Sequence, residues 1–185
     1  MPVIDANNSQ FEGLLDVAKL MMISARTAPK SGGRDDLETL LVYGEEKDEI
    51  ANEMEKIGLE RNSKGFARDS KNVKDSVAIV LIGVEGGKSF GLDCAGCGFE
   101  TCAAFEKSSK STGLDFAGPN CIFKLLDMGI ALGSAVKSAM DHNVDNRIMY
   151  RIGTVAKRLK IMKKSSVVMG VPISAKGKSI YFDRS

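Results

Sequence analysis

Residues 76–84 read SVAIVLIGV, an almost unbroken run of apolar and mostly β-branched side chains. A run of this length without alternating polar residues is typical of a strand that is buried on both faces of a sheet. The fold is therefore predicted to be a sheet with this strand at its centre and with helices packed on it.

Helix and strand patterns alternate on either side of the central strand. Ser9 and Glu12 form a capping box, and apolar side chains recur at helical spacing behind it, which predicts the first helix. Together the elements predict an α+β fold with a mixed or antiparallel central sheet. Besides the central strand and the first helix, the predicted elements are a strand over 37–43, a helix over 45–58, a polar connection over 62–72, helices over 121–140 and 146–160, and strands over 166–173 and 178–182.

The composition of the chain favours a single domain. Of its 185 residues, 43% are hydrophobic, which is enough for one substantial core over residues 1–185 with an inserted module. The formal net charge of +2 is nearly neutral for this size and gives no support to a nucleic-acid partner.

We expect a cytoplasmic protein without a membrane span. The first residues lack the basic start and the apolar run of a signal peptide. The most apolar long stretch, residues 121–140, is interrupted by Lys124, Asp127 and Lys137, so it is predicted to be a core helix. In a reducing compartment, cysteines are expected to act as ligands or redox groups rather than to form disulfides.

All four cysteines follow the central strand, at Cys94, Cys97, Cys102 and Cys121. Four thiolates complete the ligand shell of an iron–sulfur cluster or of a tetrahedral zinc ion. Structural zinc sites usually show two close pairs of ligands, whereas here three cysteines lie together and the fourth lies apart. The spacing therefore favours a 4Fe–4S cluster, with zinc as the alternative occupant.

Two resemblances support a cluster. The segment CAGCGFETCAAF, residues 94–105, with the distant Cys121, resembles the small iron–sulfur domains of acetyl-CoA-pathway and redox-complex proteins. That likeness implies an inserted ferredoxin-like segment over residues 91–121. The whole chain, including GPNCIFKLLDMGIALGSA at 118–135, also resembles a prokaryotic family of uncharacterised proteins described as containing a ferredoxin domain.

A further resemblance concerns the scaffold. A first helix that runs into ARTAPKSGG, residues 25–33, then a strand, a helix, a buried strand and a long central helix, are similar to the FMN-dependent nitroreductases. Those enzymes hold the flavin phosphate with an arginine-rich block ahead of or at the start of the first helix, where this chain has no basic residue. Arg26, Lys30, Ser31 and Arg34 are therefore expected to substitute as phosphate partners, because cations and loop N–H groups suit an anion. The alternative is an exposed loop whose charges meet only water.

Three hypotheses of function follow from these features. The first is a flavin-dependent oxidoreductase in which a 4Fe–4S cluster exchanges electrons with FMN and with a redox partner protein. The second is an electron carrier or sensor in which the cluster alone is functional. The third is a structural or interaction protein that is stabilised by zinc.

The sequence also predicts a homodimer. The helix over residues 121–140 is apolar on more than one face, and Gly129 and Gly133 permit the close approach of another helix. Nitroreductase-like proteins pair through such a helix, so the resemblance implies the same arrangement. The terminal segment, residues 177–185, is expected to add as an edge strand to the sheet of the second subunit.

Overall fold

The computed structural model describes residues 3–182 and contains a four-stranded antiparallel sheet. The strands lie in the order β1 (Leu37–Tyr43), β2 (Ala78–Val84), β6 (Val167–Ser174) and β5 (Asp145–Asn146). Every neighbouring pair of strands is antiparallel. The prediction of an α+β fold with an antiparallel sheet is therefore confirmed.

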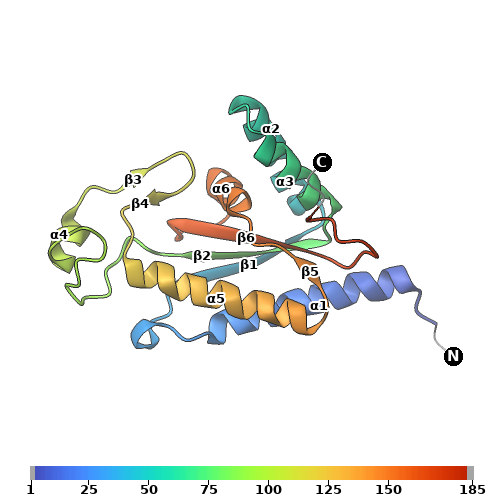
Figure 1. Cartoon of the computed structure of the whole chain (residues 1–185), viewed down its shortest axis with the longest axis horizontal. Helices are drawn as coiled ribbons and strands as arrows, with labels where there is room; N and C mark the ends of the chain where they lie inside the picture. Colours follow the sequence, from blue (N-terminus) through green and yellow to red (C-terminus); the bar gives the residue numbers. More distant parts are fainter. Residues whose placement is uncertain (1–2, 183–185) are drawn as a thin grey trace.

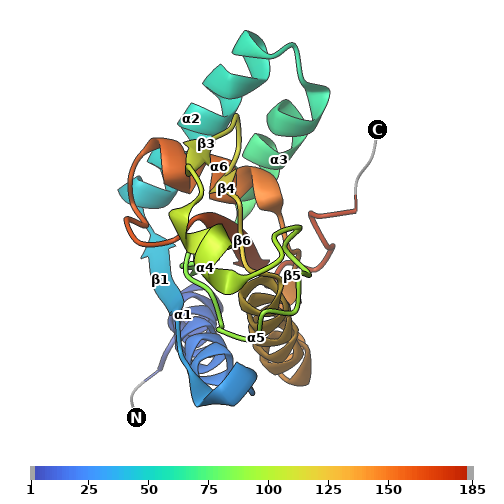
Figure 2. The same cartoon turned by 90° about the vertical axis from the view of Figure 1, so that its left-hand side faces the viewer.

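Helices cover both faces of this sheet. α1 (Ala6–Thr27) and α5 (Ile122–Asp141) lie side by side on one face (Figure 1). α2 (Glu45–Glu60), α3 (Lys64–Asp75) and α6 (Tyr150–Arg158) cover the other face, and Figure 2 shows the resulting three layers end on. Two separate hydrophobic cores result, one on each side of the sheet.

The central strand β2 is buried along its whole length. Ala78, Val80 and Ile82 point into the core beneath α1 and α5. Ile79 and Leu81 point into the core beneath α2, α3 and α6. Because successive side chains alternate between the two faces, burial of both faces requires the continuous apolar run that the sequence shows.

Two predictions for the first half of the chain are wrong: the start of the first helix and the connection over residues 62–72. The first helix begins at Ala6, because the Asp5 carboxylate accepts hydrogen bonds of 3.0 Å from the N–H groups of Asn7 and Asn8 and caps the helix before Ser9. Residues 62–72, predicted as a polar connection, contain most of α3. That helix buries few apolar side chains, so its amphipathic pattern is hidden by the many charges on its outer face.

The prediction of a strand over residues 178–182 is also wrong, since this segment is irregular. Tyr181 is buried in the core of its own chain, and its hydroxyl group lies 2.9 Å from the Ser76 hydroxyl. Arg147 holds the same segment by donating a hydrogen bond to the carbonyl oxygen of Tyr181. Residues 183–185, which belong to the predicted crossover arm, lie outside the described part of the chain.

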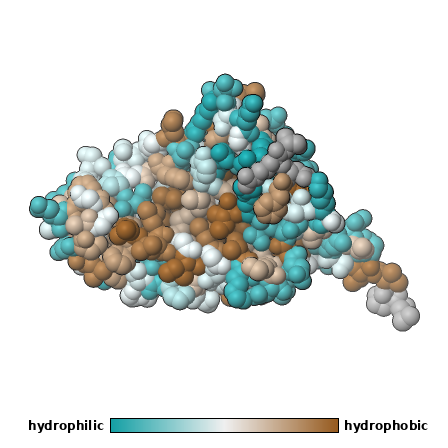
Figure 3. All heavy atoms as spheres, in the orientation of Figure 1, coloured by the Kyte–Doolittle hydropathy of each residue, from teal (hydrophilic) through white to brown (hydrophobic). Residues whose placement is uncertain are grey.

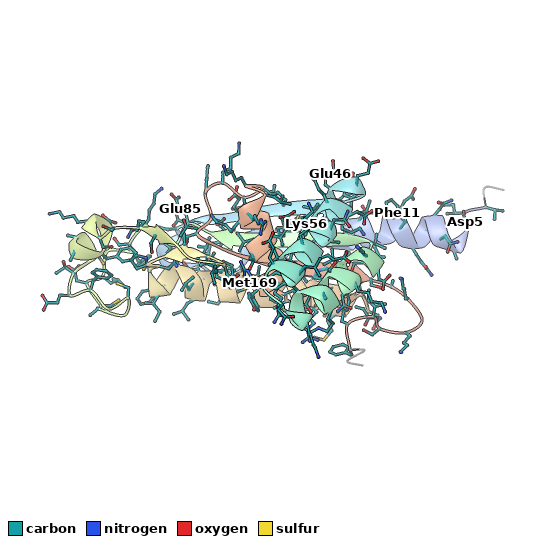
Figure 4. The ribbon with its side chains drawn as sticks, turned by 90° about the horizontal axis from the view of Figure 1, so that it is seen from above. Asp5, Phe11, Glu46, Lys56, Glu85 and Met169 are labelled. Atoms are coloured by element: carbon teal, nitrogen blue, oxygen red, sulfur yellow. The ribbon has the colours of Figure 1, made fainter. Side chains whose placement is uncertain are left out.

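Between β2 and α5 the chain leaves the sheet and forms a separate lobe at one end of the molecule (Figure 1). This lobe contains α4 (Cys102–Lys107), β3 (Ser111–Thr112) and β4 (Ala117–Gly118), and all four cysteines belong to it or border it. In Figure 4, Glu85 marks the point where the chain leaves β2, and α1 projects beyond the opposite end of the sheet. We call residues 86–121 the cysteine lobe.

Candidate metal centre

The two ends of the cysteine lobe are joined by hydrogen bonds beside the end of β2 and the start of β6. The N–H group of Cys121 donates to the carbonyl oxygen of Gly86 over 2.8 Å. The Ser166 hydroxyl accepts from the N–H group of Gly86 at 2.9 Å and donates to the Asn120 side-chain oxygen at 2.5 Å. A Cβ atom on Gly86 would lie 2.3 Å from the Asn120 side-chain oxygen, so a larger residue here would displace Asn120 from this hydrogen bond.

The loop that carries Cys94 and Cys97 is tightly coiled. Asp93 and Ala95 have φ values of 47° and 56°, and Gly98 has a φ of 85°. Residues other than glycine adopt this left-handed region only rarely. A backbone in which residues with positive and negative φ alternate directs successive N–H groups toward an enclosed space, as at many iron–sulfur sites. The coiled backbone therefore agrees with a loop that wraps around a compact anionic group.

Gly96 brings this loop onto the start of α5. A Cβ atom on Gly96 would lie 2.8 Å from a methyl carbon of Ile122 and 3.6 Å from the Cys94 sulfur. Ile122 is the first residue of α5, and Cys121 precedes it as the N-cap. The first and last cysteines are therefore held in the same part of the molecule, although they are far apart in the sequence.

Asp93 connects the third cysteine to the same loop. Its N–H group donates to the Cys102 sulfur at 3.3 Å, and its carboxylate accepts from the Cys102 N–H group at 2.5 Å. Thr101 caps α4 by accepting from the N–H group of Ala104. Ser89 connects the start of the lobe to α4, because its hydroxyl and N–H groups donate hydrogen bonds to the Glu106 carboxylate. These hydrogen bonds hold the pKa of Glu106 below its ordinary value.

The four thiols differ in their exposure to solvent. Cys121 is buried, with 5% of its surface exposed, whereas Cys97 and Cys102 are half-buried and Cys94 is exposed. A cluster at this position would therefore have a closed side against α5 and an open side toward solvent. Electron exchange with another protein requires such an open side.

The donor set fits a metal cluster, but convergence of the four thiols stays a prediction. Within residues 3–182 no group of three or more histidine, cysteine or acidic side chains is arranged closely enough to hold a metal ion. The four sulfurs are all free thiols, and they supply the ligand number and the softness that an iron–sulfur cluster or zinc needs. The coiled loop and the contact of Gly96 with α5 place their backbones around one region.

All four residues predicted to hold a flavin phosphate form hydrogen bonds within the protein, and Lys30 and Ser31 are the less accessible pair. The Lys30 ammonium group is buried and donates to the carbonyl oxygens of Arg26 and Ala28 at the end of α1. Ser31 donates from both its N–H and its hydroxyl group to one carboxylate oxygen of Asp127, each over 2.8 Å. A carboxylate therefore occupies the position at which this loop would bind an anion.

Arg26 and Arg34 are the more accessible members of that predicted set. Arg26 donates to the Asp35 carboxylate and to the carbonyl oxygen of Leu37. Burial by itself raises the pKa of Asp35, but the hydrogen bonds from Arg26 and the Leu37 N–H group outweigh it and hold this pKa below its ordinary value. Arg34 donates to the carbonyl oxygen of Phe90 at 3.0 Å.

Phe90 joins this loop to the cysteine lobe. The Arg34 guanidinium lies 5.1 Å from the centre of the Phe90 ring, and Phe123 of α5 packs against the same ring at 5.7 Å. The ammonium group of Lys124, which is buried and paired with Asp36, lies 5.6 Å from it. The predicted flavin loop and the cysteine lobe are therefore in direct contact.

Sequence reasoning missed the residues that position the cysteines. Ser166 acts through a hydrogen bond to Asn120, which is 46 positions away, and Asp93 and Asn120 also bind backbone groups nine and three positions away, contacts that follow no recognised motif. Asp93 and Asn120 each stand directly before a cysteine, and that adjacency is the signal that the sequence offers. Among residues 3–182, no helix is both long and apolar enough to span a bilayer.

The chain matches one family model in its C-terminal part and one relative over most of its length. Residues 117–184 match a family model described as "Uncharacterized protein containing a ferredoxin domain". That match includes Cys121 and excludes the other three cysteines. An uncharacterized protein of Archaeoglobus fulgidus is 51% identical over 174 residues, which cover 94% of this chain and 93% of the relative.

Solved structures show that the fold is nitroreductase-like. A nitroreductase family protein from Clostridium novyi NT has a TM-score of 0.53 and 18% identity, covering 97% of this chain and 81% of that one. The nitroreductase CinD from Lactococcus lactis, in complex with nicotinic acid, has a TM-score of 0.56 and 12% identity, with coverage of 95% and 81%. A nitroreductase with bound FMN from Desulfitobacterium hafniense DCB-2 has a TM-score of 0.55 and 13% identity, with coverage of 88% and 78%.

Proposed function

Because this chain belongs to the family of uncharacterized proteins containing a ferredoxin domain, we propose that it is an iron–sulfur redox protein on a nitroreductase-like scaffold. Residues 91–121 form its inserted ferredoxin-like segment within one domain. Cys94, Cys97, Cys102 and Cys121 hold a 4Fe–4S cluster. Such a cluster takes up and releases single electrons.

The observation that best supports this proposal is the packing of Gly96 on Ile122. It holds the loop of Cys94 and Cys97 against the helix that starts after Cys121. The N–H group of Asp93 donates to the Cys102 sulfur, and with a cluster bound such a hydrogen bond to a ligand would raise the reduction potential of the cluster. Cys121 is 5% exposed, so the cluster would be shielded from water on the side of this cysteine.

Anaerobic purification tests the proposal. We expect the broad visible absorption of an iron–sulfur cluster, about four irons and four acid-labile sulfides per chain, and a paramagnetic signal after reduction with dithionite. Colourless protein that contains one zinc ion per chain and no sulfide would instead identify the structural, zinc-stabilised alternative. Substitution of any one cysteine by serine is expected to lower the iron content.

A second candidate function is an oxidoreductase that uses FMN together with the cluster. It is favoured by the fold, since a nitroreductase of the same fold is described with bound FMN. In this function Arg26, Lys30, Ser31 and Arg34 would face the flavin phosphate, and Phe90 would separate the flavin loop from the cluster segment. Binding requires Ser31 to release Asp127, because one anion excludes the other.

Flavin titration distinguishes the two functions. If FMN binds at this loop, Asp127→Asn removes the competing charge and strengthens binding, whereas Arg34→Gln weakens it. Binding is followed by the quenching of flavin fluorescence. A matched control is Lys163→Gln, which removes one exposed positive charge from the connection between α6 and β6. If none of the proteins binds FMN, the cluster acts alone as a carrier or sensor.

We further propose that the protein is a cytoplasmic homodimer that exchanges electrons with a separate redox protein. α5 presents Leu125, Leu126 and Ile130 to solvent, and apolar residues gather over this helix in Figure 3. Gly129 and Gly133 have no atoms nearby that a side chain would meet. A surface of this kind is typical of an interface between subunits.

A further inference from the structure

A pocket with a positively charged wall lies between α3 and the segment that follows β6. Its volume is about 360 Å³. It lies on the layer of helices opposite to α1 and α5, and none of the residues assigned above to the cluster or the flavin lines it. The lining residues are Lys64, Ala67, Arg68, Lys71, Asn72, Asp75 and Ile180.

The spacing of the charged residues on α3 places them on one face of the helix. Lys64, Arg68 and Lys71 are separated by four and three positions, so their side chains follow one another along the pocket wall. Asp75 is the one carboxylate that lines the pocket with them. Arg68 is bound to Asp69 at 2.6 Å, whereas no ion pair is formed by Lys64 or Lys71 with any residue in the range 3–182.

Asn72 supplies the observation that points to a ligand. Its residue surface is 6% exposed, and its side-chain nitrogen is buried without a hydrogen-bond partner among the described residues. Buried N–H donors are almost always satisfied in folded proteins. Because Asn72 lines the pocket beside two lysines, its unused donor is expected to turn toward an acceptor that comes from outside the chain.

The pocket is held in shape without a ligand. The Ser76 hydroxyl donates to the carbonyl oxygen of Asn72 at 2.6 Å, which fixes the last turns of α3. The same hydroxyl lies 2.9 Å from the hydroxyl of buried Tyr181, which anchors the segment that contains Ile180. Both walls of the pocket are thus fixed to each other by one hydrogen-bonded group.

We infer that this pocket binds a small molecule through a phosphate group. A phosphate offers several acceptor oxygens on one dianion, and these match one amide N–H donor and two ammonium groups. A phosphate alone is smaller than the pocket, so a phosphate ester or a diphosphate fits the available volume better. Ala67 and Ile180 provide an apolar surface for the part of the ligand beyond the phosphate.

Calorimetric titration with inorganic pyrophosphate at constant ionic strength tests this site in the full chain. We expect one saturable site per chain, and affinity that falls as sodium chloride is added. Lys71→Gln is expected to weaken binding about tenfold, because a charge-assisted hydrogen bond is lost. Asn72→Asp is expected to abolish it, since it replaces the donor with a negative charge.

The control variant is Lys163→Gln, which changes the net charge equally but lies outside the pocket. Its affinity for pyrophosphate should stay within about twofold of the parent protein, because nonspecific attraction alone depends on net charge. Equal weakening by Lys71→Gln and Lys163→Gln, or the absence of saturable binding, overturns the proposal. Because Lys71 is exposed, Lys71→Gln decides the question even if Asn72→Asp does not fold.

Discussion

The Ser166 hydroxyl group donates a hydrogen bond of 2.5 Å to the side-chain oxygen of Asn120, the residue that precedes Cys121. Ser166 directly precedes β6, so this bond ties the end of the cysteine lobe to the sheet. The Asn120 amide also donates to the carbonyl oxygen of Ala117 at 2.7 Å. The position of Cys121 therefore depends on the sheet as well as on its own helix.

Asn120→Ala tests this attachment. The variant loses both side-chain hydrogen bonds of Asn120, so we expect its free energy of unfolding to fall by about 1–2 kcal/mol. We also expect iron to be lost faster when a chelator is added, because the Cys121 backbone is held less firmly. Urea denaturation and the rate of bleaching measure the two effects. Asn146→Ala, which removes a hydrogen bond on β5, should leave the rate of bleaching unchanged.

Cys121→Ser is expected to give a folded protein with a damaged cluster. α5 is held in the core by Met128, Ala131, Leu132 and Ala135, so its stability comes chiefly from packing rather than from a metal. We expect normal far-ultraviolet circular dichroism and less iron per chain. Complete loss of secondary structure after metal removal from the parent protein would contradict this and show that the metal is structural.

Gly153→Ala is expected to destabilise the protein by about 3 kcal/mol. A Cβ atom at this position would lie 1.7 Å from the carbonyl oxygen of Val168, so α6 and β6 cannot keep their present separation. Gly13→Ala on α1 is the control, because a Cβ atom there meets nothing within 4 Å. Alanine is favoured over glycine in a helix, so that variant should be more stable by roughly 0.5–1 kcal/mol. Urea denaturation measures both.

Leu126→Glu is expected to convert the proposed homodimer into a monomer. Leu126 lies on α5 and is 53% exposed, so a charge there is tolerated in a single chain but is costly in an apolar interface. Light scattering gives the mass. Leu59→Glu is the matched control, since Leu59 is 81% exposed on α2, in the layer on the other face of the sheet. A parent protein that is already monomeric, or equal dissociation of both variants, would rule out this interface.

Tyr181 should make stability decline in alkaline solution. Burial raises the pKa of its hydroxyl above the value of 10.0 expected in the unfolded chain. Between these two pKa values the unfolded state has lost a proton that the folded state keeps, so the free energy of unfolding falls as the pH rises above about 10. The contribution is fully present below that pH.

Tyr181→Phe isolates this effect. The variant lacks the hydrogen bond to Ser76 and should lose about 1 kcal/mol at neutral pH. Its stability should then fall less steeply than that of the parent protein between about pH 9 and pH 11. Urea denaturation at several pH values provides the slopes. Identical slopes would show that Tyr181 does not ionise differently in the folded and unfolded states.

The sequence by itself determined the centre of the fold. The run over residues 76–84 has no polar residue on either face of β2, and only a strand covered on both sides satisfies it. The strand β1 and the helix α5 were also predicted close to their observed bounds, because a strand pattern and a long apolar helix are local signals. The four cysteines also predict a metal site, because the number and the type of the ligands can be read directly from the sequence.

Only the tertiary structure decided how distant segments meet. α3 was mistaken for a connection, because the charges on its outer face dominate the pattern until its neighbours cover Phe66 and Val73. The donors of Ser31 are taken by Asp127, and the C-terminal segment is buried through Tyr181, because each contact joins residues that are remote in sequence. Such contacts form when the sheet brings its helices together, and their energies depend on burial and on partners that no local pattern encodes.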